Sequence, residues 1–451
     1  MCKALATLDK AKHTLLNVKK LRKYYIYIIY KMANVQNNSN ANSSLVNTML
    51  GSDSLMNPNV YSTKMIVPPH ALTYSPMDPS NGSVITDGST TNFTVNKYGI
   101  ISQILFSYEK TVTGTGGAGD KTVTIGVNDV FSVIEKVELL SSSRVISTLT
   151  RYDLMSQFSS LPLDTFIAID EGCVKPRTVV VTGTASKTET YTIPLVFGFM
   201  LAANTQLNAS FLEPLSVKIY YGKTLATAAV ANTSVSIANP KIMVRYKNYQ
   251  EEANAKILAE NFENPTLNLL LCRYYDENRS SLITTAAAAG EARTLQVELK
   301  NTDCVEDFYF VLVKSEVGGS ATVPGDYTDF TPQEITNLKF TGSGQEFCNL
   351  NESQLNYGRI DSYGFAHVLP ATASGSNLAR IKTFQTGIYD SHVMENTLSL
   401  REINNPLVEV SFTAVSDGTN ATQYSLYVVE KCSSIYAINS ATGSLQISLS
   451  N

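Results

Sequence analysis

The fold is decided by the stretch from Asn396 to Ser450, NTLSLREINNPLVEVSFTAVSDGTNATQYSLYVVEKCSSIYAINSATGSLQISLS. From Val408 to Ala414 apolar and polar residues alternate, which is the period-2 pattern of a half-buried strand. Asp417-Gly418 predicts a turn, and the run from Tyr424 to Val429 predicts the returning strand. The stretch therefore predicts several short antiparallel strands with no catalytic constellation among them.

A similar Pro-Leu step before an alternating strand lies about 190 residues upstream, in FLEPLSVKIYY from Phe211 to Tyr221. Two further pairs of segments keep the same order along the chain: Ile134–Ile146 with Ile335–Phe347, and Ile242–Tyr249 with Tyr424–Lys431. This order predicts one β-fold that occurs twice. One detail conflicts, because relative to the proline the apolar phase of the two strands differs by one residue. We expect the structure to show either a bulge or a chance match there.

Strand patterns also cover the rest of both halves. The predicted strands are Ile100–Lys110, Lys121–Val127, Val133–Leu140, Thr178–Val181, Thr190–Phe199, Leu215–Tyr221, Ile242–Tyr246, Leu267–Tyr275, Thr294–Leu299, Asp307–Lys314, Glu334–Phe340 and Phe365–Leu369. The glycine-rich segments Thr113–Asp120 and Val181–Ser186 are interpreted as hairpin tips rather than phosphate loops, because no Gly-Lys-Ser/Thr follows them. The apolar run Ile193–Ala203 is too short to span a bilayer and is interpreted as a buried strand.

Two segments have helical patterns. In Thr150–Ser160, Leu154 and Phe158 are spaced four residues apart and Thr150 is a suitable N-cap. In Asn248–Asn264, apolar residues recur at helical spacing, acidic residues occupy the first turn and Pro265 follows. We interpret the second segment as a helical connector between two β-domains. The expected organisation is an N-terminal arm at 1–60, a first sandwich at 61–247, the connector at 248–264 and a second sandwich at 265–451.

The charge distribution argues against a nucleic-acid-binding body. Charged residues make up 16% of the chain, against about 25% in an average soluble domain. The whole chain has a formal net charge of −4, and residues 1–31 contribute +7 to it, so the remaining residues sum to −11. An acidic body does not favour phosphate contacts. We therefore expect no direct sequence-specific binding of nucleic acid.

The N-terminal residues allow two interpretations. Residues 1–31 are basic and end in the aromatic run Tyr24–Tyr30, which is too short to span a membrane and unlike a signal peptide. They are either an arm at a membrane surface or inside a capsid, or they precede a translation start at Met32. Residues 32–60 are polar and aperiodic, so we expect them to become ordered only against a partner.

The sequence predicts no catalytic, cofactor-binding or metal-binding residues. The four histidines, His13, His70, His367 and His392, are isolated. The six cysteines lie far apart without a CxxC pair, which predicts buried free thiols in a reducing compartment; they are Cys2, Cys173, Cys272, Cys304, Cys348 and Cys432. Asp164, Asp170 and Glu171 offer carboxylates for a cation, but a solvated loop is the preferred interpretation.

Several of these segments together resemble the double jelly-roll major capsid proteins of tailless icosahedral DNA viruses. Thr192–Tyr221 is similar to the closing strands of that family's first jelly roll, with an Ile-Pro-Leu step, a short excursion and a second Pro-Leu. Val133–Met155 is similar to the early strand pair and the short helix that follows it. The C-terminal stretch looks like the end of the second jelly roll, most like that in polinton-like viruses and virophages. The resemblance covers about residues 60–451.

The resemblance implies an all-β fold of two consecutive eight-stranded antiparallel jelly-roll sandwiches, with a few short helices in loops. It also implies a non-enzymatic major capsid protein that forms a homotrimeric, pseudo-hexagonal capsomer within an icosahedral virion. Neighbouring capsomers, penton and minor capsid proteins and an internal membrane would be its partners. The alternative function is a secreted or surface-displayed lectin-like or adhesin-like β-sandwich, for which we expect a signal peptide and clustered sugar or cation ligands.

Overall fold

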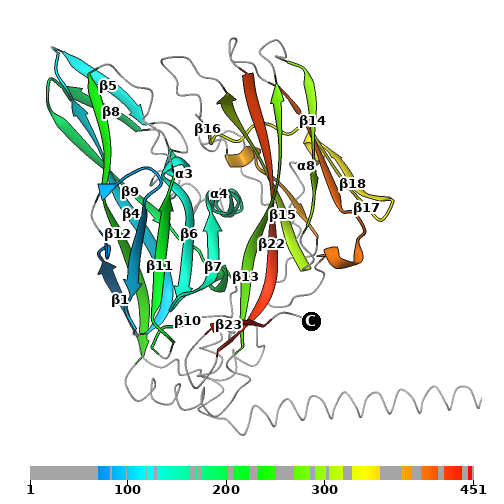
Figure 1. Ribbon diagram of the computed structural model, residues 1–451, viewed down its shortest axis with the longest axis horizontal. Coiled ribbons are helices and arrows are strands. Elements are labelled where there is room, and N and C mark those ends of the chain that lie inside the picture. The colour runs from blue at the N-terminus through cyan, green and yellow to red at the C-terminus, as the bar shows by residue number, and fades with distance from the viewer. Residues whose placement is uncertain are drawn as a thin grey trace, which may run out of the picture. The chain divides into compact units, whose positions relative to one another are not determined.

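The computed structural model describes most of the chain from residue 70 onward (Figure 1). The described ranges are 70–81, 84–97, 99–117, 119–125, 129–161, 177–201, 207–210, 212–222, 232–249, 269–284, 290–300, 304–317, 328–355, 378–386, 398–414, 421–438 and 445–448, with single residues at 169, 172, 174 and 175. The expected N-terminal arm, the strand Phe365–Leu369 and the turn Asp417-Gly418 lie outside these residues. No helix in the described ranges is long and apolar enough to cross a membrane.

The strands between residues 70 and 249 form a sandwich of two antiparallel sheets and a separate two-stranded ribbon. The larger sheet, sheet A, is built from β1 (His70–Met77), β2 (Val84–Ile85), β4 (Ile100–Gly114), β9 (Ser186–Pro194), β10 (Leu207–Asn208) and β12 (Thr233–Tyr249). The facing sheet B has the order β3 (Thr90–Val95), β11 (Leu215–Tyr221), β6 (Ile134–Ser141), β7 (Arg144–Thr150). The ribbon pairs β5 (Asp120–Ile125) with β8 (Arg177–Thr182).

The strands from residue 269 onward form a second sandwich with the same plan. Its larger sheet, sheet D, consists of β13 (Leu269–Thr284), β15 (Cys304–Val317), β16 (Thr328–Asp329), β19 (Lys382–Gln385), β20 (Leu398–Ser399), β22 (Ala421–Ile438) and β23 (Leu445–Ser448). The facing sheet E has the order β14 (Ala292–Glu298), β21 (Leu407–Thr413), β17 (Asn337–Gly342), β18 (Gln345–Asn351). Every described strand pairs only within its own sandwich.

Short helices occupy a few connections. They are α3 (Val130–Val133), α4 (Arg151–Ser159), α6 (Gly198–Leu201), α8 (Glu352–Leu355) and the 3-10 turns η4 (Leu378–Arg380) and η5 (Leu400–Glu402). The helix predicted at Thr150–Ser160 is confirmed as α4. The predicted connector lies mostly outside the described residues, and its first two residues, Asn248 and Tyr249, are instead the end of β12, paired with Ala71 and His70.

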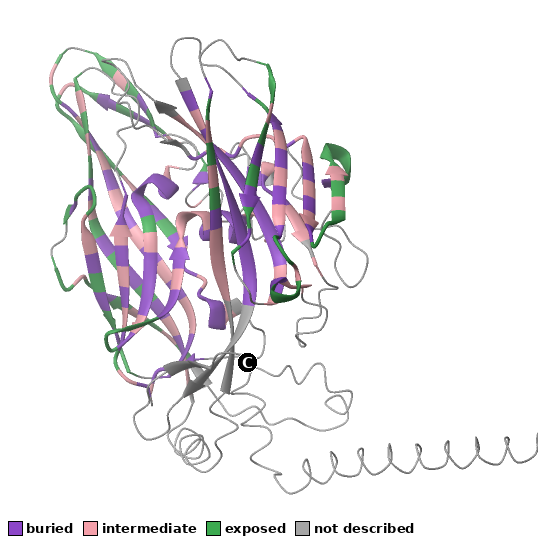
Figure 2. Ribbon diagram, turned by 45° about the vertical axis from the view of Figure 1, so that its right-hand side comes forward, coloured by how far each residue is buried: buried purple, intermediate pink, exposed green. Residues whose placement is uncertain are grey.

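The alternating sequence patterns explain the strands. Strand β11 has the predicted bounds, and its residues alternate between buried and half-buried from Leu215 to Tyr221. Val217 and Ile219 thus enter the core while Ser216 and Lys218 face outward. The same alternation occurs in β21, where Val408, Val410 and Phe412 are buried. In each sandwich the sides of the two sheets that face each other are buried (Figure 2).

The apolar run Ile193–Ala203 is not a single strand. Strand β9 ends at Pro194, and α6 follows within the run. Proline has no N–H to continue the sheet ladder, which explains the end of the strand. Helix α6 then packs against β13 of the second sandwich. An apolar run of this length does not distinguish a buried strand from a short buried helix.

The two glycine-rich segments are turns but not hairpin tips. The first joins β4 to β5 and the second joins β8 to β9, yet β4 pairs with β9 and β5 pairs with β8. The two turns meet each other: the N–H of Gly114 donates to the carbonyl of Ala185, at 3.0 Å. A Cβ on Gly114 would lie 2.1 Å from the carbonyl oxygen of Gly183, so the close approach requires glycine. Turn chemistry predicted the reversals, but the pairing partners come from distant residues.

The hairpins β6–β7 and β17–β18 are copies of one structure. Each turns through a serine with positive φ, Ser142 (55°) and Ser343 (51°). Each also has a register shift one residue pair from the turn, which leaves Ile146 and Phe347 as the extra residues. The predicted match between Ile134–Ile146 and Ile335–Phe347 is therefore confirmed, down to the position of the bulge.

The phase conflict at the two prolines also has a structural explanation. Strand β11 pairs Val217 with Leu139 of β6, and β21 pairs Val408 with Phe340 of β17, the equivalent position. The two strands are therefore equivalent, but Pro406 corresponds to Leu215 and the proline-to-proline alignment is wrong by one residue. The N–H of Ser142 donates to the carbonyl of Pro214, directly before Leu215, whereas the N–H of the equivalent Ser343 donates to the carbonyl of Asn404. Asn405, which has a positive φ of 51°, is therefore one extra residue before Pro406.

Candidate functional site

The residues considered for chemistry do not form a site in the described part of the chain. Asp164, Asp170 and Glu171 lie outside it, as do His13, His367 and His392, and His70 is the first residue of β1. The described residues contain no group of three or more side chains suited to hold a metal ion. Among the described cysteines, Cys432 is buried and Cys304 and Cys348 are half-buried. The most elaborate set of polar contacts is instead the junction where α4 meets sheet D.

Local sequence explains how α4 begins. The side chain of Thr150 accepts from the N–H of Asp153 at 3.2 Å, and the carboxylate of Asp153 accepts from the N–H of Thr150 at 2.7 Å. This reciprocal capping box satisfies two backbone donors at the start of the helix. It also holds the first turn of α4 in one orientation, with Arg151, Tyr152 and Asp153 in consecutive positions.

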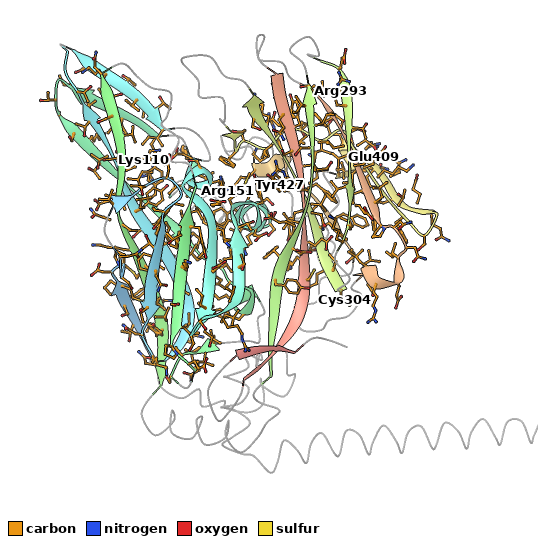
Figure 3. The ribbon with its side chains drawn as sticks, in the orientation of Figure 1. Lys110, Arg151, Arg293, Cys304, Glu409 and Tyr427 are labelled. Atoms are coloured by element: carbon orange, nitrogen blue, oxygen red, sulfur yellow. The ribbon has the colours of Figure 1, made fainter. Side chains whose placement is uncertain are left out.

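These residues make the contacts between the two sandwiches. The ring of Tyr152 stacks on Tyr427 of β22, with 3.5 Å between centroids and 19° between planes. The guanidinium of Arg151 lies over the ring of Phe330, 4.8 Å from its centroid. The hydroxyl of Thr150 donates to the carboxylate of Glu277 on β13. Figure 3 labels Arg151 and Tyr427 on the two sides of this junction.

The junction is dry enough to change the ionisation of its acids. Burial raises the pKa of the Asp153 carboxyl well above its usual range, and the nearby Glu277 charge raises it further. Burial likewise raises the pKa of Glu277. It also lowers the pKa of Arg151, through loss of hydration of the guanidinium. The Oδ1 atom of Asp153 is buried without a hydrogen-bond partner. Both carboxyls therefore hold their protons more tightly in the folded protein than in the unfolded chain.

The face of sheet D beneath α4 is apolar on both sides of its central strands. In β15, Phe308, Phe310 and Leu312 pack in the core of the second sandwich, whereas Tyr309, Val311 and Val313 pack with the core of the first. In β22, Val428 and Val429 divide in the same way. The unbroken apolar run from Phe308 to Val313 is the sequence signal for burial on both faces, and the alternation criterion alone does not detect it.

Among the described residues, no helix covers the equivalent face of sheet A as α4 covers sheet D. Equivalent positions in the two sheets can be identified from a bulge that occurs in both. The register between β4 and β12 shifts between Arg245 and Tyr246 of β12, and the register between β15 and β22 shifts between Lys431 and Cys432 of β22. On this basis Met243 corresponds to Val429. Met243 is 41% exposed and Tyr74 of β1, the pairing partner of Arg245, is 52% exposed, whereas Val429 is fully buried.

The equivalent of α4 in the second sandwich is α8. It follows β18 directly, as α4 follows β7, and it begins with the same capping box. The side chain of Asn351 accepts from the N–H of Gln354, and the side chain of Gln354 accepts from the N–H of Asn351, each at 3.0 Å. Leu355 is buried like its counterpart Leu154, while Glu352, Ser353 and Gln354 are exposed. Each sandwich thus has a capped helix and an equivalent sheet face, and among the described residues the contact between such a helix and such a face is made by α4 and sheet D.

Comparisons with known proteins identify the fold. No family model matches the sequence, and no curated protein matches it. Solved structures do match: a chain of the PBCV-1 virus capsid (13% identity, TM-score 0.55, covering 87% of this chain and 100% of that one), the Faustovirus major capsid protein (9%, 0.56, 88% and 98%) and the mavirus major capsid protein (11%, 0.52, 84% and 90%). Identities this low establish the fold. The chain therefore has the double jelly-roll fold of viral major capsid proteins, as its sequence predicted.

Proposed function

We propose that this chain is the major capsid protein of an icosahedral DNA virus, a non-enzymatic structural protein of the virion. It assembles as a homotrimer with pseudo-hexagonal outline, and such capsomers tile the shell. The fold shared with major capsid proteins supports the capsid role. The predicted domain division, with the first sandwich extended to Tyr249 at the end of β12, is part of the same proposal.

The observation that carries the trimer is the unmatched pair of surfaces. Within the chain, α4 of the first sandwich covers sheet D of the second. The equivalent helix α8 and the equivalent face of sheet A have no partner of this kind among the described residues. A second copy of the chain supplies both, since its α8 region fits on sheet A as α4 fits on sheet D. Repetition of one contact type within and between copies closes into a symmetric ring.

The composition of the sheet A face suits a contact between separately folded copies. Tyr74, Met243 and the half-buried Leu105 form its apolar centre, and Lys241 and Arg245 flank them. At the corresponding positions of sheet D, Tyr309 and Val429 are buried and Tyr427 takes the place of Lys241, while Lys431 takes the place of Arg245. Interfaces that form after folding are generally more polar than the interior of a chain. The sheet A face therefore serves contact between copies, and the sheet D face serves contact within one copy.

Neighbouring capsomers, penton and minor capsid proteins and an internal membrane are the further partners of this proposal. The acidic charge of residues 32–451 supports a shell role without sequence-specific contacts to nucleic acid.

Light scattering on the purified full chain tests the proposal. The expected mass is three times that of the 49.2 kDa chain or that of a closed shell, with pseudo-hexagonal particles in electron micrographs. A strictly monomeric mass at micromolar concentration, over a range of salt concentration, would contradict the capsomer.

A further inference from the structure

Three ionisable side chains meet in the centre of sheet D. The Nζ atom of Lys431 on β22 lies 3.0 Å from Oδ2 of Asp307 and 3.3 Å from Oε2 of Glu306, both on β15. The exposed fractions of the three side chains are 5%, 3% and 14%. An amine and two carboxyl groups are thus held together almost without water.

The backbone explains why both acids reach the same lysine. Asp307 pairs directly with Lys431 across the two strands, and the next pair is Val305 with Cys432. Glu306 is the extra residue of this bulge, so it does not follow the normal alternation of faces. Thr386, the residue directly after β19, stabilises the bulge, because its N–H and its hydroxyl both donate to the carbonyl of Glu306.

The first sandwich contains the same bulge without the reactive groups. There Arg245 takes the place of Lys431, and Ser102 and Gln103 take the places of Glu306 and Asp307. The Nε of Arg245 donates to the hydroxyl of Ser102 at 3.0 Å. The bulge therefore belongs to the repeated fold, whereas the combination of lysine, aspartate and glutamate belongs to sheet D alone.

We propose that Lys431 and Asp307 form an intramolecular amide (isopeptide) bond, with Glu306 as the group that transfers the protons. Burying an amine and two carboxyl groups as ions is costly, and an amide removes one charge pair. Fixing the reacting groups at contact distance replaces an encounter in solution by an effectively intramolecular step. Lysine is also the cation that loses its proton most readily when buried.

The reaction needs no other reagent. Glu306 takes a proton from the Lys431 ammonium and passes it to the Asp307 carboxylate. The free amine attacks Cγ of Asp307, and a second proton moves from the nitrogen through Glu306 to the departing hydroxyl group. One C–N bond forms, one C–O bond breaks, one water leaves, and Glu306 returns to its starting state.

The bond would covalently tie the two central strands of the sheet that joins both sandwiches. The linked residues are 124 positions apart in the chain, so the crosslink closes a long loop in the unfolded protein. Loops of this length restrict the unfolded chain strongly. The crosslink would therefore stabilise the fold by restricting the unfolded chain, which an ion pair does not do. The inference does not depend on the capsid assignment.

Mass spectrometry of the full chain, denatured after prolonged incubation at neutral pH, tests the bond. We expect a mass lower than that of the sequence by one water molecule, and a branched tryptic peptide that joins Lys431 to Asp307. Unbranched peptides of normal mass for both residues would overturn the inference and leave an ion pair. Lys110 and Asp129, a buried pair 2.7 Å apart whose lysine contacts no second carboxylate among the described residues, provide an internal control that should remain unlinked.

Two variants separate the chemistry from the fold. Glu306→Gln should lose the branched peptide, whereas the exposed control Glu346→Gln should keep it. Asp307→Asn should remain unlinked or, if it forms the bond, lose ammonia instead of water. Loss of ammonia would show that residue 307 supplies the leaving group. A branched peptide in Glu306→Gln at the wild-type rate would contradict the role of Glu306. Since the wild-type peptide map decides the bond itself, a variant that fails to fold does not affect that test.

Discussion

Strands β4 and β15 occupy the same position in the two sandwiches, yet they are buried differently. In β4, Ile104, Phe106 and Tyr108 are buried, while Leu105 and Ser107 between them are only half-buried. In β15 every residue from Phe308 to Val313 is buried. The equivalent outer faces of the two sheets therefore differ. The outer face of sheet A is exposed to solvent or, in the proposed assembly, to a second copy, whereas the same face of sheet D packs against the first sandwich of its own chain.

The largest expected effect compares equivalent positions on the two outer faces. Val311 of β15 is fully buried, and its counterpart by strand register is the half-buried Ser107 of β4. Val311→Asp leaves an unpaired charge in the junction and should lower the free energy of unfolding by about 4 kcal/mol. Ser107→Asp should lower it by less than about 1 kcal/mol. Urea unfolding of both variants measures the difference, and equal losses would mean that the two faces are not distinct.

The stacked tyrosines of the junction should give the next largest effect. Tyr152→Ala and Tyr427→Ala each remove a ring from the contact between α4 and sheet D, and each should cost about 3 kcal/mol. The double variant should cost less than the sum of the two, with a coupling energy of about 1 kcal/mol for the ring pair. Chemical denaturation of the four proteins checks this, and strict additivity would show that the rings do not stabilise each other.

The buried acids of the junction predict a pH dependence of stability. The folded-state pKa values of Asp153 and Glu277 are raised, so the folded protein binds protons more tightly than the unfolded chain. This contribution to stability is greatest at or below the unfolded pKa of about 4 and decreases as the pH rises toward the folded values. Asp153→Asn, which keeps a capping side chain, should be relatively more stable than the wild type at pH 8 than at pH 5. Unfolding curves at the two pH values test this, and an unchanged pH slope would contradict it.

The smallest effect on folding is expected on the outer face of sheet A. Met243→Asp should change the free energy of unfolding of the single chain by less than about 1 kcal/mol, because the side chain is already 41% exposed. If the chain assembles as proposed, this substitution should nevertheless dissociate the trimer. The control is Val180→Asp on β8, another exposed apolar residue, at 46%, which should leave the trimer intact. Light scattering distinguishes the two, and a stable trimer of Met243→Asp would place the contact between copies elsewhere.

Strands and helices were predicted well where their sequence pattern involves only residues a few positions apart. The alternation of Leu215–Tyr221 gave a strand with the observed bounds, and Thr150 before a helical spacing gave α4 with its cap. The failures have a common cause. The run Ile193–Ala203 was wrongly interpreted as one strand, because an apolar run alone does not reveal that α6 packs against β13. The prediction of hairpin tips at Thr113–Asp120 and Val181–Ser186 was wrong, because β4 pairs with β9 and β5 pairs with β8. Such pairing depends on residues that are distant in the chain.

The junction was not predicted at all. Asp153 was recognised neither as the second half of a capping box nor as a buried acid beside Glu277, since those residues are far apart in the chain. The cluster of Lys431, Asp307 and Glu306 was not predicted either, because Lys431 is far from the two acids in the chain. The continuous apolar run Phe308–Val313 is a sequence signal from which burial of the sheet on both faces could have been predicted.

By itself, the sequence determined the all-β character, the repetition of the fold and the positions of most strands, because periodicity, turns and caps act over a few residues. Only the tertiary structure decided which strands pair, which of two equivalent sheets is covered and which ionisable groups meet. Those outcomes depend on residues distant in sequence, and on the loss of water when the two sandwiches pack together.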